Sequence, residues 1–473
     1  MTAPAPPISV TYDIDSRPPL QVAIPLALQH VLVMMASNVS LPLVLATAIG
    51  MTTAERAFLV QVALLVAGIT TLVQTIGIGR IGSRLPVVQG TSSGFLIVSI
   101  PLAQQYGISA VFGGAVFAGL VQMGLGFGLK WLKKLFPPLV SGVVMLVIGI
   151  GLIPVGLGLF GGGAESDDFG SLTNLALASL VTLVILVAYR YGRGVINAAS
   201  VLVGLIVGYL TAVALGLVDF GPVSDASWFS FPVPLKYGIS LPAAALVSMG
   251  VMAIATSVET IGHLTALTKS AAGRDITHRE LEGGVVADGF STAFASLFSA
   301  LPNTTFAQNV GLVTLTGVLS RFVVSLGGIF LIVLGLFPKL ATVIAVMPPS
   351  VIGGAGVVMF GMVLASGVKL IADAPIDRHD LLVIAVSVGL GQGFALVPEV
   401  TAGLPASVSL IINTGLAPAV LFAVVMNLVR PRTDEGGFLT QVDSVPSAGL
   451  GKDSAAGTTE AQRIDTGNDQ DPD

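Results

Sequence analysis

The sequence contains no cysteine and very few charged residues. The absence of cysteine excludes disulfides, thiolate metal sites and cysteine nucleophiles. Charged residues make up 10% of the 473 residues, whereas a soluble protein has about 25%. The four histidines show no metal-ligand spacing, and no Walker-type phosphate loop is present. A metal-dependent or nucleotide-hydrolysing enzyme is therefore not supported, and no catalytic dyad can be assembled from the remaining residues.

The chain is instead strongly apolar, with 53% hydrophobic residues and a mean hydropathy of +0.92. Crossing a bilayer takes roughly 20 apolar residues per helix. The sequence therefore predicts an all-α polytopic membrane protein, with no nucleic-acid partner and with fourteen candidate spans. These are 20–42, 57–77, 84–102, 109–128, 138–160, 172–190, 195–218, 239–268, 283–300, 302–317, 319–337, 343–371, 379–396 and 404–429.

Basic residues supply an independent test of the span count, because lysine and arginine gather on the cytoplasmic side. With the N-terminus placed inside, 18 of the 21 basic residues fall on the cytoplasmic side, and only Arg56, Lys236 and Lys339 fall outside. We therefore expect both termini in the cytoplasm and the protein in the cell membrane. Residues 1–19 are expected to form a cytoplasmic segment and 433–473, rich in small polar residues, a disordered cytoplasmic tail.

Two markers repeat along the chain at nearly the same interval. The Pro-Pro pair at Pro137 returns at Pro348, an offset of 211 residues (348 minus 137). Leu85-Pro86 and Leu301-Pro302 open two polar, interrupted segments 216 residues apart (301 minus 85). An odd number of seven spans per half predicts an inverted repeat, an architecture that permits alternating access to a site at the membrane midplane.

The interrupted segments, 85–95 and 301–311, are too polar for ordinary membrane helices. A broken backbone at that depth survives only inside protein or against a cavity, so both segments point to a buried binding site. Gln308 and Asn309 lie in the second segment, and Gln89 takes the corresponding place in the first. Side-chain amides both donate and accept, which suits the C=O and N–H edge of a heterocycle. The alternative is a role in bonding helices together.

Three ionisable residues lie within predicted spans, where such groups are costly and default to functional hypotheses. Glu259 and His263 are four residues apart and share one helix face. A buried carboxylate there could bind a proton near neutral pH. The alternative is a structural pair. Asp288 lies a few residues into the ninth span. It is either a hydrogen-bonded relay or anchor behind the site, or a carboxylate favoured by the helix dipole.

The segment from Gln308 to Gly317 resembles the signature of the nucleobase–ascorbate transporters, also called nucleobase:cation symporter 2. That signature reads Q/E/P-N-x-G-x-x-x-x-T-R/K/G, and every fixed position matches. Supporting matches lie along most of the chain outside the tail: Arg17-Pro18-Pro19, Gln29-His30, Leu85–Gly90, Phe136-Pro137-Pro138, Glu259 with Gly262-His263, and Pro302-Asn303-Thr304.

The resemblance implies short strands in spans 3 and 10, a transporter domain over 20–432, a core of spans 1–4 and 8–11, and a gate of spans 5–7 and 12–14. It also implies a homodimer through the gate domains. Substrate would lie between core and gate. The base would be bound by Glu259, by Gln308 and by backbone at Ala307, while Asp288 supports proton coupling.

The expected substrate contacts are Glu259, Gln308, Ala307, Asn309, Gln89, Ser93 and Phe306, and the expected proton-coupling residues are Glu259, Asp288 and His263. Many members of the family have an aromatic residue where this chain has Ser93, so stacking on the base is expected from Phe95, Phe306 or elsewhere. Glutamine at 308 and at 89 resembles the xanthine and uric acid branch, whereas His263 resembles the uracil branch.

The resemblance thus predicts a symporter, not an enzyme, that imports xanthine or uric acid with protons and needs no cofactor beyond the proton. A uracil permease is the alternative within the family. An inorganic-anion carrier of the related sulfate/bicarbonate fold is the alternative outside it.

Overall fold

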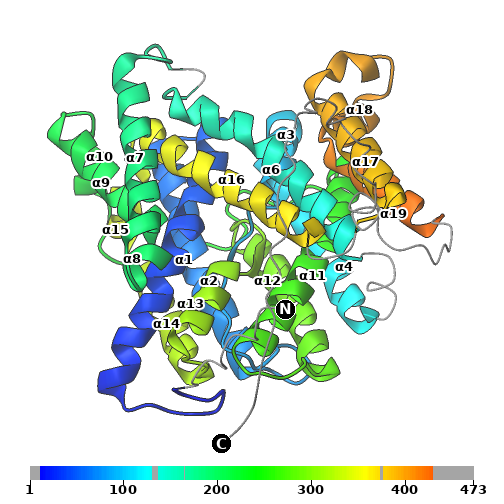
Figure 1. Ribbon diagram of the computed structural model, residues 1–473. Coiled ribbons are helices and arrows are strands. Elements are labelled where there is room, and N and C mark those ends of the chain that lie inside the picture. Colours follow the sequence, from blue (N-terminus) through cyan, green and yellow to red (C-terminus); the bar gives the residue numbers. More distant parts are fainter. Residues whose placement is uncertain (1–10, 130–136, 164–165, 373–375, 430–473) are drawn as a thin grey trace, which may run out of the picture.

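Nearly all of the regular structure is helical. The computed structural model describes residues 11–129, 137–163, 166–372 and 376–429 (Figure 1). Its helices in the first half are α1 (Leu20–Ala48), α2 (Thr53–Ile76), α3 (Leu96–Tyr106), α4 (Ile108–Phe127), α6 (Pro138–Phe160), α7 (Leu172–Tyr191), α8 (Val195–Ala198), α9 (Ser200–Ala214) and α10 (Gly221–Asp225).

The second half continues with α11 (Ala243–Ser270), α12 (His278–Leu297), α13 (Ala307–Thr316), α14 (Arg321–Gly335), α15 (Pro338–Ala345), α16 (Pro349–Ala372), α17 (Arg378–Leu396), the short 3-10 helix η1 (Pro398–Thr401), α18 (Ala406–Asn413) and α19 (Leu416–Leu428). The two strands are β1 (Gln89–Thr91) and β2 (Asn303–Thr305). The predicted tail, 433–473, and residues 1–10 lie outside the described residues.

Every one of the fourteen predicted ranges contains at least part of a helix, but the helices differ in length. Among the described residues, eight are long and apolar enough to cross a membrane, or up to ten if each of two bent pairs counts as one span. The bends are 82° between α14 and α15 and 69° between α18 and α19. The protein is therefore a helical, multi-pass membrane protein, and the count of fourteen stays a prediction.

Prolines and glycines determine several helix boundaries. Helices α6, α15 and α16 each begin with proline, whose missing N–H costs nothing in a first turn. The predicted span 343–371 consequently starts later as a helix, at Pro349, because Pro348 and Pro349 interrupt the chain after α15. Gly415 separates α18 from α19 with φ of +71°, a conformation that a side chain would disfavour.

The helices pack in two sets. Helices α1, α2, α4, α11, α12 and α14 pack mainly with one another, and α6, α7, α9, α16, α17 and α19 form the second set. Figure 1 shows α16 running beside α6, and the two approach closely because both carry small residues. A Cβ on Gly149 would lie 2.6 Å from the backbone nitrogen of Leu364, and one on Gly367 would lie 2.7 Å from that of Leu146.

Candidate functional site

The two interrupted segments meet as a pair of antiparallel strands. Gln89 pairs with Thr305, Gly90 with Thr304 and Thr91 with Asn303. Both predicted strands are thus present, and pairing satisfies backbone groups that have no water partner at membrane depth. Gly90 is required by close approach, because a Cβ there would lie 2.5 Å from Cε2 of Phe306 and 2.9 Å from Cε of Met34.

Asp288 joins this strand pair to two helices. Its buried carboxylate accepts hydrogen bonds from Nε2 of Gln89 on β1 and from the backbone N–H (3.2 Å) and hydroxyl (3.0 Å) of Thr305 on β2. The hydroxyls of Thr304 and of Thr260, on α11, also donate to it. Because every bond is directed at a carboxylate oxygen, the geometry suits an ionised group that positions the strands.

The structure corrects the expected location of Asp288 along its helix. Helix α12 begins at His278, ten residues before Asp288, because Thr277 and Glu280 form a capping box that starts the helix early. A carboxylate in the middle of a helix gains little from the helix dipole, which acts within the first turn. The dipole alternative therefore does not fit, and the hydrogen-bonded anchor does.

A central pocket lies directly in front of the strands. Its lining includes Glu259 and His263 from α11 and Phe306, Ala307 and Gln308, where β2 passes into α13. Ser93, Thr91, Thr304 and Thr305 complete the wall formed by the interrupted segments. Six predicted site residues, Glu259, His263, Ser93, Phe306, Ala307 and Gln308, therefore share one cavity.

Glu259 and His263 face each other within this pocket. Nε2 of His263 lies 4.0 Å from Oε1 of Glu259, and both side chains are about one-fifth exposed (19% and 20%). Nδ1 of His263 is 3.2 Å from the carbonyl oxygen of Thr305. Since a carbonyl can only accept, Nδ1 carries the hydrogen, and the lone pair on Nε2 of the neutral ring is directed toward the carboxyl group. At 4.0 Å the two groups are too far apart for a direct hydrogen bond, so a ligand or a water molecule between them would mediate any proton exchange.

The start of α13 adds hydrogen-bond donors to the pocket. No side chain caps this helix, so the backbone N–H groups of its first turn have no helical acceptor. Ala307 and Gln308 are exposed where they line the cavity. A helix N-terminus next to a side-chain amide offers donors for carbonyl oxygens or negative charge.

The opposite wall is formed by residues that the sequence analysis did not select. They are Ser37 and Leu41 of α1, Met145 of α6, and Met359, Met362, Val363 and Ser366 of α16. The hydroxyl of Ser37 lies 3.5 Å from the sulfur of Met359. Methionine is a flexible, polarisable contact for a flat ring. No local motif marked these residues, because they reach the pocket only through the packing of α6 and α16.

Several predicted residues lie behind the pocket. Gln89 is buried and donates to Asp288 and, at 3.0 Å, to the hydroxyl of Thr305. Asn309 donates to the backbone oxygen of His30 at 3.0 Å and lies 3.1 Å from Nδ1 of that ring. Phe95 is 1% exposed and lines no described part of the pocket. Of the two candidates for stacking, Phe306 is the one that faces the cavity.

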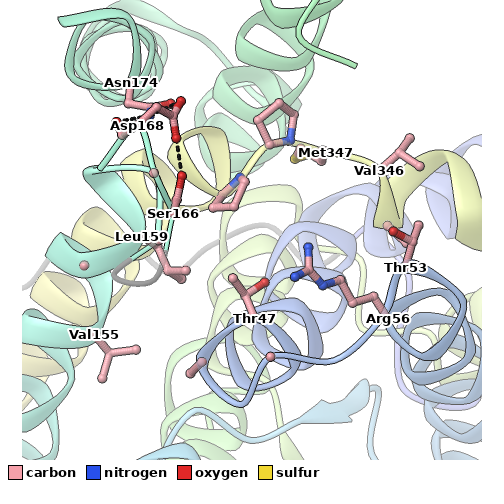
Figure 2. A pocket seen from close by; sticks show the side chains of 18 of the residues that line it. Thr47, Thr53, Arg56, Val155, Leu159, Ser166, Asp168, Asn174, Val346 and Met347 are labelled. Atoms are coloured by element: carbon pink, nitrogen blue, oxygen red, sulfur yellow. Dashed lines mark hydrogen bonds between the residues drawn. The ribbon is translucent and has the colours of Figure 1, made fainter. Parts of the chain in front are cut away.

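A second, larger cavity of about 850 Å³ contains none of the predicted site residues (Figure 2). It is formed by the α1–α2 connection, the ends of α3 and α6, the α6–α7 connection and the start of α16. Among the described residues, the charged side chains that line it belong to Arg56, Asp168 and, on the segment before α10, Asp219.

Comparison with known proteins identifies the family. A sequence model of the Permease family (Xan_ur_permease) matches residues 21–400. The chain is 37% identical over 406 residues to the xanthine permease of Bacillus subtilis, covering 85% of this chain and 92% of that one. It is 36% identical over 428 residues to the uric acid permease PucJ of the same organism, covering 89% and 95% of the two chains.

Solved structures share the fold at much lower identity. The transmembrane domain of the cyanobacterial bicarbonate transporter BicA aligns with a TM-score of 0.51 at 16% identity, over 88% of this chain and all of that one. Murine Slc26a9, an anion transporter solved in the inward-facing state, aligns with a TM-score of 0.54 at 16% identity, over 86% and 68% of the two chains. The likeness concerns the fold alone. Sequence identity and the family match together show that the chain belongs to the permease family that includes xanthine and uric acid permeases, as its signature predicted.

Proposed function

We propose that the protein is a symporter that imports an oxidised purine, xanthine or uric acid, together with protons. The observation that carries the proposal is the central pocket, in which the carboxyl group of Glu259, the amide of Gln308 and the ring of Phe306 surround one cavity. A planar base with alternating C=O and N–H groups can stack on the ring while pairing with the amide and the carboxylate. The names of the related permeases support the same substrates.

Proton coupling is the part of the proposal that depends on Glu259 and His263. Protonation of the Glu259 carboxyl group would give this side chain a hydrogen-bond donor. After loss of the proton, the carboxylate can only accept. Binding of the base and of the proton can therefore favour each other, which is the linkage that a symporter requires. Asp288 supports this site from behind through the strands and carries no direct contact with the base.

The fourteen-span arrangement belongs to the same proposal. The two packing sets of helices support a core and a gate, and the cavity between Glu259 and Met359 lies where they meet. Helices α6 and α16, which begin at matching Pro-Pro pairs, support the inverted repeat. We place both termini in the cytoplasm, the protein in the plasma membrane and a homodimer contact on the gate helices.

Uptake into intact cells tests the proposal. Cells expressing the protein should accumulate labelled xanthine or uric acid, and a protonophore should abolish accumulation. Uptake that survives collapse of the proton gradient but follows sodium would overturn proton coupling. A competition series of xanthine, uric acid, uracil, guanine and hypoxanthine would identify the base, since uracil as the best competitor would favour the branch that His263 resembles.

An inorganic anion is the less favourable cargo for this pocket. A small inorganic anion has no N–H group to direct at the carboxyl group of Glu259, so its charge would face the carboxylate directly and be repelled. Bicarbonate or sulfate that failed to compete with the labelled base would agree with this argument.

A further inference from the structure

The larger cavity is separated from the central pocket by apolar residues on three helices. On α1, Leu41 lines the central pocket and Thr47 the larger cavity, and buried Val44 lies between them. On α6, buried Leu152 lies between Met145 and Pro154. On α16, Ile352 takes the same position between Pro349 and Met359. The two cavities therefore lie on opposite sides of one closed apolar layer.

The larger cavity lies on the side that we propose to face outward. It contains Arg56, one of the basic residues that the charge pattern places outside, and the ends of helices that the span order places there. The lining of the central pocket, by contrast, extends along α16 to Ser366, close to the predicted cytoplasmic Lys369. A solute from outside would reach the larger cavity first.

Arg56 has donors to spare in this cavity. Its Nε donates to the carbonyl oxygen of Met51 at 3.0 Å, and across the described residues no carboxylate is recorded within 4.0 Å of its guanidinium. The neighbouring carboxylate of Glu55 instead accepts from the backbone N–H and hydroxyl of Thr52 at 2.9 and 2.8 Å. Within the part of the chain that the structure describes, the terminal nitrogens of Arg56 have no carboxylate partner, and they form a planar fork that suits an oxyanion.

A second polar group beside Arg56 also lacks a partner. Figure 2 shows the guanidinium of Arg56 extending toward Thr47. The hydroxyl oxygen of Thr47 is buried and has no hydrogen-bond partner among the described residues. Because this oxygen is not accessible from the cavity, a ligand cannot reach it, and Arg56 supplies the donors for a ligand.

The facing wall carries the opposite charge. Asp168, in the α6–α7 connection, accepts hydrogen bonds from the hydroxyl of Ser166 and, at 2.9 Å, from the amide of Asn174 (Figure 2). These bonds hold the pKa of Asp168 below its usual range, so it stays ionised at neutral pH. A ligand that fits both walls carries a negative oxygen at one edge and N–H donors at another. The urate monoanion has that arrangement, and a halide or sulfate ion does not.

We propose that this cavity is an entry subsite, in which Arg56 binds the anionic form of an oxidised purine before the apolar layer opens. The inference rests on the proposed function and its orientation. It assigns Arg56 a part in selecting charged over neutral bases, separate from recognition of the base by Glu259 and Gln308.

Inhibition of uptake from outside tests this subsite. At mildly acidic pH urate is a monoanion and xanthine is neutral. Uptake of one labelled base is therefore measured with increasing concentrations of unlabelled urate or of unlabelled xanthine, which gives an inhibition constant for each. Arg56→Gln should raise the inhibition constant of urate about tenfold, because loss of a hydrogen bond to a charged group weakens binding by that order. The inhibition constant of xanthine should change less than about twofold. Added salt should weaken inhibition by urate in the wild type and have little effect on it in Arg56→Gln. Arg56→Lys keeps the positive charge and should restore most of the preference for urate.

Lys339→Gln is the matched control. Lys339 is predicted on the same side of the membrane, but it lies over the ring of Trp228, 4.8 Å from the ring centroid, and outside the cavity. It should leave both inhibition constants unchanged. Equal effects of Arg56→Gln on urate and xanthine, no effect on either, or the same effect from Lys339→Gln would overturn the subsite. Failure of the wild type to accumulate any base would overturn the proposed function, and the subsite with it.

Discussion

At the residue scale, Glu259 is the carboxylate that lines the central pocket beside His263. Its replacement by glutamine keeps the shape and removes the proton-binding group. We expect Glu259→Gln to bind base weakly and to lose concentrative uptake, measured as the ratio of internal to external labelled base. Glu399→Gln, on an exposed residue far along the chain, is the control and should accumulate base normally. Accumulation by Glu259→Gln at the wild-type rate would show that another group binds the coupled proton, with Asp288 the next candidate.

Gln308 allows a test of how the base edge is recognised. Gln308→Glu replaces an amide donor by a second acceptor, which would face a ring carbonyl. An unpaired buried polar group costs about 1–3 kcal/mol, or roughly tenfold to a hundredfold in affinity. We expect this loss to differ among competing bases, whereas Gln308→Ala should weaken all of them. An unchanged ranking of competitors for Gln308→Glu would show that Gln308 only supports the fold.

Asp288 is expected to matter for stability as well as uptake. Asp288→Asn replaces a carboxylate that accepts from Gln89, Thr260 and Thr305 by an amide that brings its own donors to the same place. The cost should be about 1–3 kcal/mol, visible as a lower midpoint of thermal unfolding in detergent. Ser291→Ala, on the same helix, removes a buried hydroxyl that has no partner among the residues that the structure describes, and should leave the midpoint unchanged. An equal midpoint for both variants would contradict the anchoring role.

At the scale of elements, the strand pair depends on the absence of a side chain at Gly90. A Cβ at this position would overlap the ring of Phe306. We therefore expect Gly90→Ala to separate β1 from β2, to abolish base binding and to lower the unfolding midpoint. Gly124→Ala is the control, because a Cβ there meets nothing within 4 Å and alanine favours the helix. Normal uptake by Gly90→Ala would show that the strands tolerate a wider spacing.

The elements also show which parts of the site a sequence can predict. Pro86, Pro302 and Gly90 predict interrupted helices, and hence a buried site, from local chemistry, whereas the strands themselves followed from the resemblance to the family. A hydrophobic run alone predicts too late a start for α12, because a polar capping box at Thr277 begins this helix. The methionines at 145, 359 and 362 were missed because their position depends on how two distant helices pack.

At the scale of the whole molecule, orientation can be tested directly because the chain has no cysteine. We expect Asp167→Cys to react with a membrane-impermeant maleimide in intact cells, since its connection is predicted outside. Asp275→Cys, between α11 and α12, should react only after the membrane is permeabilised. Both residues are exposed, so access depends on the side of the membrane alone. Labelling of Asp275→Cys in intact cells would overturn the fourteen-span arrangement.

The pairing of β1 with β2 has a consequence for how the chain is made. Gln89 and Thr305 lie 216 residues apart, so β1 enters the membrane long before its partner has been synthesised. Until then its backbone groups have no strand partner in a medium that supplies no water. The amino-terminal half should therefore be a transient species that needs shielding during biogenesis. The two halves, expressed as separate chains in the same cell, should together restore uptake. A connection of this length holds the two strands near each other only weakly, so its loss should change the free energy of pairing little.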